Sequence, residues 1–203
     1  MIQILRKCVI ASVIGFSSMI LAQFALPTFQ ALHQTQSQCP GTDCALYFDG
    51  PGSSDYVNID GGQNGGSHTF EVWVKRIDSG ANQSLLLQGD NYGIKIEQYN
   101  QNNKVGFTRY GSYDHQFNHS ATIAEWEHIA IVNNSSKTYL YVNGTVTDSS
   151  NRTNWKLPMN SIGISGNSTL YGTIDEMRIW NDARTAAEIA DNMELELNGD
   201  EDD

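Results

Sequence analysis

Residues 172–180 read "GTIDEMRIW", a stretch that has the character of a β-strand but places two carboxylates, Asp175 and Glu176, side by side. Adjacent residues of a regular strand point to opposite faces of its sheet. The pattern therefore predicts that the two carboxylates do not act together on one substrate atom. We expect Glu176 to pair with Arg178, two residues along on the same face, and Asp175 to join neighbouring strands or bind a metal ion.

The continuation "NDARTAAEI" predicts a turn and a helix. Thr185 and Glu188 have the spacing of a capping box, in which each side chain binds a free backbone amide of the other residue. Ile189, Met193 and Leu197 then recur every fourth residue. This periodicity predicts a short amphipathic helix that lies on the body of the domain.

The rest of the chain consists of short apolar stretches separated by turn residues. Residues 67–77, "SHTFEVWVKRI", alternate between apolar and polar side chains, and "YVNGTV" holds an Asn-Gly pair that is typical of a tight hairpin. About eleven short strands in this length exceed a minimal sandwich. The sequence thus predicts an all-β fold, a two-sheet antiparallel jelly-roll sandwich with one short C-terminal helix.

Charge argues against one class of partner. The chain has 203 residues, 12 Lys and Arg against 23 Asp and Glu, and a net charge of −11. Nucleic-acid binding needs clustered cations, and the basic residues here are scattered along the sequence. We therefore expect no nucleic-acid partner.

The N-terminus has the pattern of a secretory leader. The segment "MIQILRK" carries Arg6 and Lys7 and precedes a long apolar run over residues 8–26. We predict a signal peptide over residues 1–31, a linker over 32–43, a domain over 44–197 and an acidic tail over 198–203. The protein is then secreted or at the cell surface, with no stable membrane insertion after leader removal. An uncleaved anchor is the alternative, because the run is nearly long enough to span a bilayer.

Two cysteines remain beyond the leader, Cys39 and Cys44 in "CPGTDC". An oxidising compartment and a short Pro-Gly loop favour a disulfide between them. Two free thiols are the alternative. A zinc site would need two further soft ligands nearby, and the local sequence has none.

A set of motifs resembles a known family: "ALYFDG…DYVNI…HTFEVWVK…WEHIAIV…LYVNG…IGIS…GTIDEMRIWNDART…EI". In order and spacing they are similar to the laminin-G-like jelly-roll domain of the concanavalin A-like lectin/glucanase superfamily, over residues 44–197. The resemblance implies a concave and a convex sheet. It also implies a secreted or cell-surface module that binds glycans or proteins, or that serves as a spacer.

The resemblance further implies a structural calcium ion as cofactor. In related domains the first and last strands lie side by side, and Asp49 and Asp175 occupy the corresponding segments. Calcium prefers carboxylate and carbonyl oxygens, so these two residues are the predicted metal ligands. The alternative is that Asp49 belongs to an Asx turn and that Asp175 binds backbone amides.

Catalytic residues are harder to find. A retaining glycosidase needs two carboxylates about 5–5.5 Å apart, and the E-x-D-x-x-E strand of related glucanases is absent from the sequence. Glu125 and Glu127 have same-face spacing, but they alternate with Trp126 and His128, a pair that precedes a core strand in the family. A transition-metal pair of His115 and His119 lacks a third ligand.

A sugar-binding surface has better support. Aromatic side chains next to amides suit carbohydrate rings, and several lie near predicted loops such as "RYGSYDHQF" and "EQYNQNN". For any single aromatic residue, packing in the core is the alternative. The predicted ligand-binding residues are Tyr92, Tyr99, Tyr110, Tyr113 and Trp155.

Together these patterns predict a secreted, non-enzymatic module that binds carbohydrate or a cell-surface glycoprotein. An adhesion or structural spacer domain without a small ligand is one alternative. A glycan-cleaving hydrolase that uses Glu125 and Glu127 is the other.

Overall fold

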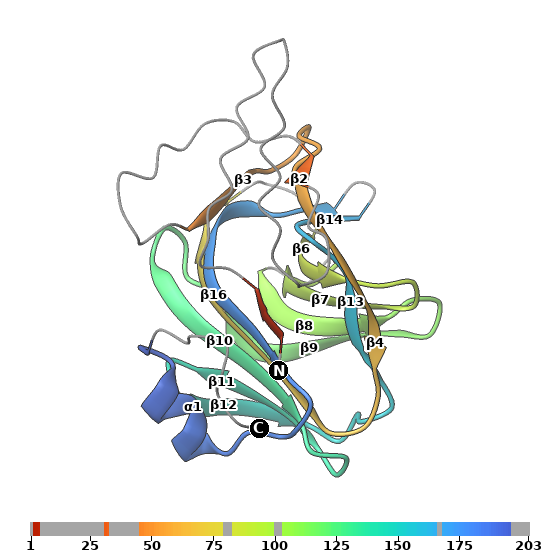
Figure 1. The fold of residues 1–203 in the computed structure, drawn as a ribbon, viewed down its shortest axis with the longest axis vertical. Helices are drawn as coiled ribbons and strands as arrows, with labels where there is room; N and C mark the ends of the chain where they lie inside the picture. The colour runs from red at the N-terminus through yellow and green to blue at the C-terminus, as the bar shows by residue number, and fades with distance from the viewer. Residues whose placement is uncertain are drawn as a thin grey trace, which may run out of the picture.

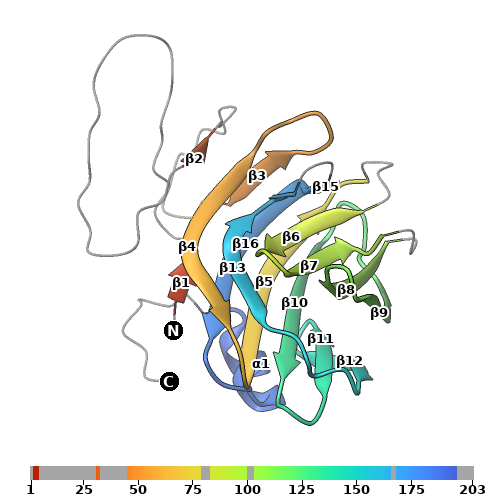
Figure 2. The same cartoon turned by 90° about the vertical axis from the view of Figure 1, so that its right-hand side faces the viewer.

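The computed structural model describes residues 2–4, 31–32, 45–78, 83–99, 103–165 and 168–195. These residues form two seven-stranded antiparallel sheets, a two-stranded sheet and one helix (Figures 1 and 2). The two large sheets lie face to face with the core between them. This arrangement confirms the predicted jelly-roll sandwich.

Sheet A contains, in spatial order, β1 (Ile2–Ile4), β16 (Tyr171–Trp180), β5 (His68–Arg76), β10 (Trp126–Asn133), β11 (Thr138–Val142) and β12 (Thr145–Ser150), and its seventh strand, β3 (Leu46–Asp49), also pairs with β16. Sheet B contains β2 (Ala31–Leu32), β4 (Tyr56–Asn64), β13 (Leu157–Ile162), β6 (Ser84–Gln88), β7 (Tyr92–Glu97), β8 (Lys104–Arg109) and β9 (Tyr113–Ser120). The small sheet contains β14 (Ile164–Ser165) and β15 (Ser168–Thr169), and the helix is α1 (Ala186–Asn192).

Two short strands fall within the segments predicted to be leader and linker. The backbone of β1 pairs with β16, and that of β2 pairs with β4. These pairings do not test cleavage of the leader, so the boundaries of the leader, linker and domain stay a prediction. Cys39, Cys44 and the tail over residues 198–203 lie outside the described residues, so the disulfide stays a prediction. No helix within the described ranges is long and apolar enough to cross a membrane.

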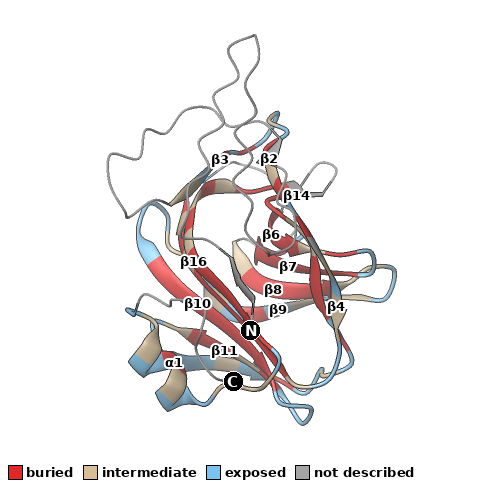
Figure 3. Ribbon diagram, in the orientation of Figure 1, coloured by how far each residue is buried: buried red, intermediate tan, exposed pale blue. Residues whose placement is uncertain are grey.

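The core follows from alternation along the strands. Phe70, Val72 and Val74 of β5 are fully or almost fully buried, and they belong to one hydrophobic cluster with Phe107 and Phe117 of sheet B. Figure 3 shows the buried residues concentrated in the strands of both sheets. The side chains between them point to the outer faces, as a period of two requires.

The hairpin and helix signals are confirmed. Asn143 and Gly144 both have positive φ, 48° and 73°, as a type I′ turn between β11 and β12 requires. Thr185 and Glu188 form the capping box at the start of α1, and Ile189 packs on the outer face of sheet A.

The helix is shorter than its periodicity predicts: α1 ends at Asn192, before Met193. Side chains of sheet A bind the backbone carbonyls that follow. Trp73 Nε1 donates to the carbonyl of Met193 at 2.8 Å, and Arg178 donates to the carbonyls of Asn192 and Leu195. Carbonyls at a helix end have no partner within the helix, and these side chains supply partners for them.

The stretch 172–180 departs from regular alternation. A β-bulge interrupts the pairing of β16 with β5 between Asp175 and Arg178, and Glu176 has a φ of 46°. Ile174 and Met177 are therefore three residues apart and both in the core. The expectation that Asp175 and Glu176 point to opposite faces was wrong, because the bulge inserts an extra residue. The pairing of Glu176 with Arg178 is confirmed, at 3.1 Å.

One strand was read as a loop. "YDHQFNHS" forms β9 at an edge of sheet B, with Phe117 buried and Asp114, Gln116 and Asn118 exposed. Its alternation between buried and exposed residues is hard to recognise in the sequence, because most of its side chains are polar. One face of the strand is exposed to solvent, as is common in antiparallel sheets.

A buried ion pair joins the two sheets. Arg76 at the end of β5 donates to Glu97 at the end of β7, and both side chains are almost completely buried. Arg76 also donates to the carbonyl of Ala121 at 3.3 Å. Burial raises the pKa of the Glu97 carboxyl, and the Arg76 guanidinium opposes that shift.

We predict that Arg76→Ala lowers the free energy of unfolding by about 3–5 kcal/mol, because it leaves the Glu97 carboxylate buried without its partner. The double variant Arg76→Met/Glu97→Leu should recover most of this loss, since it buries no charge. Chemical denaturation measures both. The exposed Lys137→Ala serves as the control, and a loss from Arg76→Ala no larger than that of the control would contradict the prediction.

Candidate functional site

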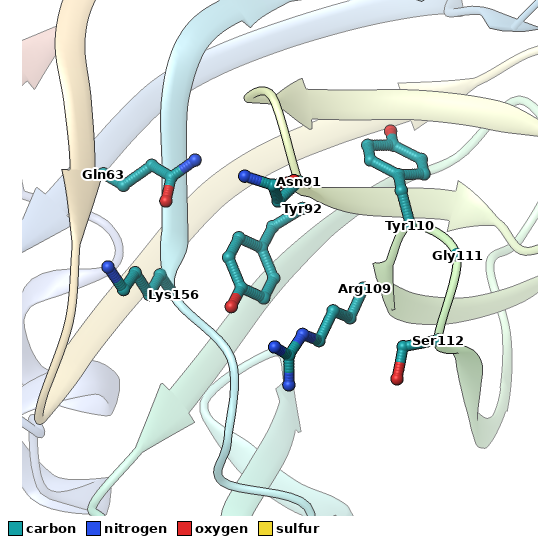
Figure 4. Close-up of a pocket in the computed structure, with 8 residues that line it drawn as sticks. All are labelled: Gln63, Asn91, Tyr92, Arg109, Tyr110, Gly111, Ser112 and Lys156. Atoms are coloured by element: carbon teal, nitrogen blue, oxygen red, sulfur yellow. The ribbon is translucent and has the colours of Figure 1, made fainter.

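Sheet B opens into a recess where β13 leaves its neighbour. In the described residues, β13 pairs with β6 only through Ser161 and Ile162, while the rest of β13 stays paired with β4. The resulting first recess has a volume of about 490 Å³. In Figure 4, Gln63 and Lys156 lie on one side, the turn after β8 lies on the other, and Tyr92 stands between them. The lining residues are Gln63, Asn91, Tyr92, Arg109, Tyr110, Gly111, Ser112 and Lys156.

The turn over residues 109–112 forms the wall of this recess. The amide of Ser112 donates to the carbonyl of Arg109 at 2.9 Å, and Gly111 adopts a φ of 72° that favours glycine. The amide of Tyr110 donates to the carbonyl of Asn91 at 2.9 Å, which ties this turn to the one between β6 and β7. Backbone hydrogen bonds thus hold the wall in place.

A second recess of about 430 Å³ lies on the other side of the same turn. Ile94, Ile96 and Phe107 face the core, so Lys95 and Thr108 between them point to the outer face of sheet B. Residues 109–112 line both recesses. The remaining residues of the second recess are Gln83, Lys95, Tyr99, Thr108, Tyr113 and Asp114.

The base of the second recess is a polar network. Lys95 Nζ donates to Gln83 Oε1 at 2.8 Å and lies 3.8 Å from Asp114 Oδ1. Thr108 Oγ1 donates to Asp114 Oδ1 at 2.5 Å. Burial lowers the pKa of the Lys95 ammonium, and Asp114 opposes that shift. Because each charge has a partner, the network is a fixed polar floor rather than a free charge.

Gln98 connects this floor to an exposed aromatic residue. Its Nε2 donates to the carbonyl of His115 at 3.0 Å, and its Oε1 accepts from the amide of Tyr99 at 3.0 Å and lies 3.2 Å from Thr108 Oγ1. The Tyr99 side chain is 46% exposed. The buried Gln98 thus fixes the backbone from which Tyr99 reaches the solvent.

Four of the five predicted ligand-binding residues come together here. Tyr92 lines the first recess, Tyr99 and Tyr113 line the second, and Tyr110 lines both. The guanidinium of Arg152 lies 4.3 Å from the centroid of the Tyr113 ring. The structure therefore gathers these tyrosines around one turn, with Tyr92 and Tyr113 supplied by β7 and β9 and the other two by the segments that follow β7 and β8.

Trp155, the fifth, lies elsewhere. It is 3% exposed, stacks on Phe107 with ring centroids 4.6 Å apart, and donates from Nε1 to Thr138 Oγ1 at 3.0 Å. It lines neither recess. Its ring is a core element in this structure, in line with the packing alternative.

Sequence reasoning missed the polar residues that complete the two recesses, among them Lys95, Arg109, Asp114 and Lys156. Lys95 carried a signal, because it is the one cation in the buried run "YGIKIE". The sequence around Lys156 carried no such signal, because Lys156 and Tyr92 are far apart in the sequence and come to line one recess only through the path of the chain into β13.

The predicted calcium ligands are not brought together. Asp49 is paired with Tyr171 of β16, whereas Asp175 stands opposite Trp73 four residues further along. That spacing is about 13 Å of strand at roughly 3.3 Å per residue, too far for one ion. Asp175 Oδ1 accepts from the amide of Glu176 at 2.9 Å, as the alternative expected. The described residues contain no group of three or more His, Cys, Asp or Glu side chains suited to a metal ion.

Glu125 and Glu127, the carboxylate pair of the hydrolase alternative, line neither recess. Glu127 accepts from the amide and hydroxyl of Thr122 at 3.1 and 2.8 Å and contacts His119 at 3.4 Å, while Glu125 is exposed before β10. Burial alone would raise the pKa of the Glu127 carboxyl, but the hydrogen bonds from His119 and Thr122 outweigh it and lower that pKa. These bonds occupy the Glu127 carboxylate and tie it to the segment before β10. His115 packs instead between Phe107 and Phe117.

The sandwich and its recesses define the chain as a lectin-like β-sandwich domain. It belongs to the laminin-G-type family of the concanavalin A-like lectin/glucanases superfamily, whose sequence profile matches residues 51–190. No curated protein matches the chain.

Solved structures share the fold. A protein from Bacteroides ovatus with a provisional assignment as carbohydrate-binding gives a TM-score of 0.57 at 18% identity, over 75% of this chain and 48% of its own. Domain 4 of a GH43 extracellular arabinanase from Geobacillus stearothermophilus, in complex with arabinotriose, gives 0.53 at 19% identity, over 73% of this chain and 81% of its own.

A third similar structure is the binding domain of botulinum neurotoxin DC in complex with rat synaptotagmin II. It gives a TM-score of 0.61 at 14% identity, over 80% of this chain and 45% of its own. This chain thus spans less than half the length of the first and third structures. At these identities the likeness shows the fold alone.

The neighbourhood of Trp155 also contains a buried histidine. His68 is fully buried, its Nδ1 lies 3.0 Å from the carbonyl of Gly66, and its ring meets Trp155 edge-on at 4.5 Å. Burial lowers the pKa of His68 from 6.5 to about 4, against the opposing effect of the Gly66 hydrogen bond. His68 is therefore neutral in the folded state at pH values where the unfolded chain takes up a proton.

We predict that this histidine makes the fold acid-sensitive. Its contribution to stability is fully present above pH 6.5 and is lost as the pH falls towards about 4, where the loss reaches about 3 kcal/mol. Denaturation of the native chain and of His68→Gln between pH 7 and 4 measures this component. Equal pH dependence in the two proteins would contradict the assignment.

Proposed function

We propose that the two recesses around residues 109–112 form the carbohydrate-binding site of a secreted or cell-surface module. The observation that carries the proposal is the gathering of Tyr92, Tyr99, Tyr110 and Tyr113 around one turn with a fixed polar floor. Sugar rings present apolar faces that stack on aromatic rings and hydroxyls that need hydrogen-bond partners. Both kinds of contact are available here within one site.

The similar structures add support at the level of the fold. One is provisionally assigned to carbohydrate binding, and another was solved with arabinotriose. A protein partner such as a cell-surface glycoprotein fits the same surface, and the neurotoxin domain in complex with synaptotagmin is an example with this fold. We favour carbohydrate because the recesses are small and polar.

We propose binding without catalysis. Among the described residues, Asp114 is the single carboxylate that lines either recess, and it is bound to Thr108 and lies near Lys95. Glycoside hydrolysis by the usual mechanisms needs two carboxylates across one sugar bond. Glu125 and Glu127 line neither recess, so they do not supply the pair.

We predict that Tyr110→Ala weakens glycan binding by at least about tenfold, because Tyr110 lines both recesses. Tyr99→Ala should weaken it less. A glycan array identifies a ligand, and isothermal titration calorimetry measures the affinities. Tyr47→Ala is a matched control, since this exposed tyrosine lies on β3 of sheet A. Equal losses in Tyr47→Ala and Tyr110→Ala, or no glycan bound by the native chain, would contradict the proposal.

A structural calcium ion remains a proposal that rests on the resemblance. An ion bound only by the folded state stabilises it by about 2.7 kcal/mol at a hundredfold excess over its dissociation constant, and this raises the melting temperature. Melting with calcium and with a chelator tests the proposal, and Asp49→Asn and Asp175→Asn, made separately, show which of the two carboxylates, if either, is a ligand. Identical melting curves in the two conditions would remove calcium from the proposal.

A further inference from the structure

The two recesses have a charge opposite to that of the chain. The sequence has 12 basic and 23 acidic residues, yet Lys95, Arg109 and Lys156 line the recesses and Asp114 is the one carboxylate among the lining residues. Arg152 adds a fourth cation beside Tyr113. This concentration of basic residues on an acidic protein calls for a chemical explanation.

The two recesses also differ from each other. In the second, the Lys95 ammonium is paired with Gln83 and Asp114. Arg109 lines both recesses and joins Lys156 in the first, where the described lining residues include no carboxylate. Within the part of the chain that the structure describes, their side chains form no ion pair or hydrogen bond. The first recess therefore holds unbalanced positive charge.

Both cations line the same recess. Figure 4 shows Arg109 and Lys156 on opposite sides of Tyr92, with the Arg109 side chain extending toward Tyr92 and the Lys156 ammonium pointing toward β4. Gln63, Asn91 and Ser112 provide further hydrogen-bond donors along the lining. A guanidinium binds carboxylate or sulfate oxygens through two parallel hydrogen bonds, and an ammonium acts as a point charge beside them.

We propose that the first recess binds the anionic group of an acidic sugar, a carboxylate or a sulfate ester, and that the second recess binds a neutral sugar of the same chain. The inference rests on the proposed carbohydrate site and adds its ligand class and orientation. Tyr110 and Gly111 lie between the recesses, so the bound glycan crosses the turn over residues 109–112. Arg109 and Lys156 select the acidic unit, and Tyr99 and Tyr113 contact its neighbour.

The test compares matched acidic and neutral ligands by calorimetry on the full chain. One pair is an oligogalacturonate and its fully methyl-esterified form, and the other is a sulfated oligosaccharide and its desulfated form. The two pairs distinguish a carboxylate from a sulfate as the source of charge. We expect at least one acidic ligand to bind about tenfold or more tightly than its neutral counterpart.

Variants then assign this preference to the recess. Arg109→Gln and Lys156→Gln should each reduce affinity for the acidic ligand by more than for its neutral counterpart, and the double variant should abolish the preference. Arg109→Lys should restore only part of it, because an ammonium lacks the two-bond geometry. Lys104→Gln, which removes a cation that lines neither recess, is the matched control, and melting temperatures confirm that each variant folds.

The outcomes separate this inference from the proposed function. Binding of neutral glycans as tightly as acidic ones would overturn the acidic-ligand inference and leave the carbohydrate site intact. An acid preference that survives in the double variant, or that Lys104→Gln removes, would also overturn it. Absence of binding to every glycan, acidic or neutral, would overturn both.

Discussion

The ion pair between Arg76 and Glu97 links the packing of the sandwich to the proposed binding surface. It joins the end of β5 in sheet A to the end of β7 in sheet B, in a part of the core where both charges are shielded from water. Gln98 follows directly and is itself buried, with contacts to His115, Thr108 and Tyr99. A change in the separation of the sheets at this point would therefore move the floor of the second recess.

Local signals in the sequence predicted the elements that local physics controls. The Asn143–Gly144 turn needs positive φ at two successive residues, and few other sequences provide it. The capping box at Thr185 is equally local, because both of its bonds lie within four residues. Such signals do not depend on the rest of the chain, which is why both predictions were confirmed.

The errors arose where pairing between distant strands decides the outcome. The bulge at Asp175 exists only against β5, and nothing in "GTIDEMRIW" shows that Glu176 will adopt a positive φ. The separation of Asp49 from Asp175 is likewise a matter of register along β16. A shift by one residue moves every side chain to the other face, so site assignments that depend on register need the structure.

The candidate site occupies the place where sheet B loses its internal pairing. β13 carries a register irregularity between Met159 and Ser161 and pairs with β6 only beyond it, so among the described strands its first half is paired with β4 alone. Unpaired strand edges expose backbone groups and are costly to bury without a partner. A polar recess open to solvent is one arrangement in which such an edge is tolerated. The topology thus fixes where the proposed site opens, and the proposed preference for an acidic ligand depends on the side chains of Arg109 and Lys156 that line it.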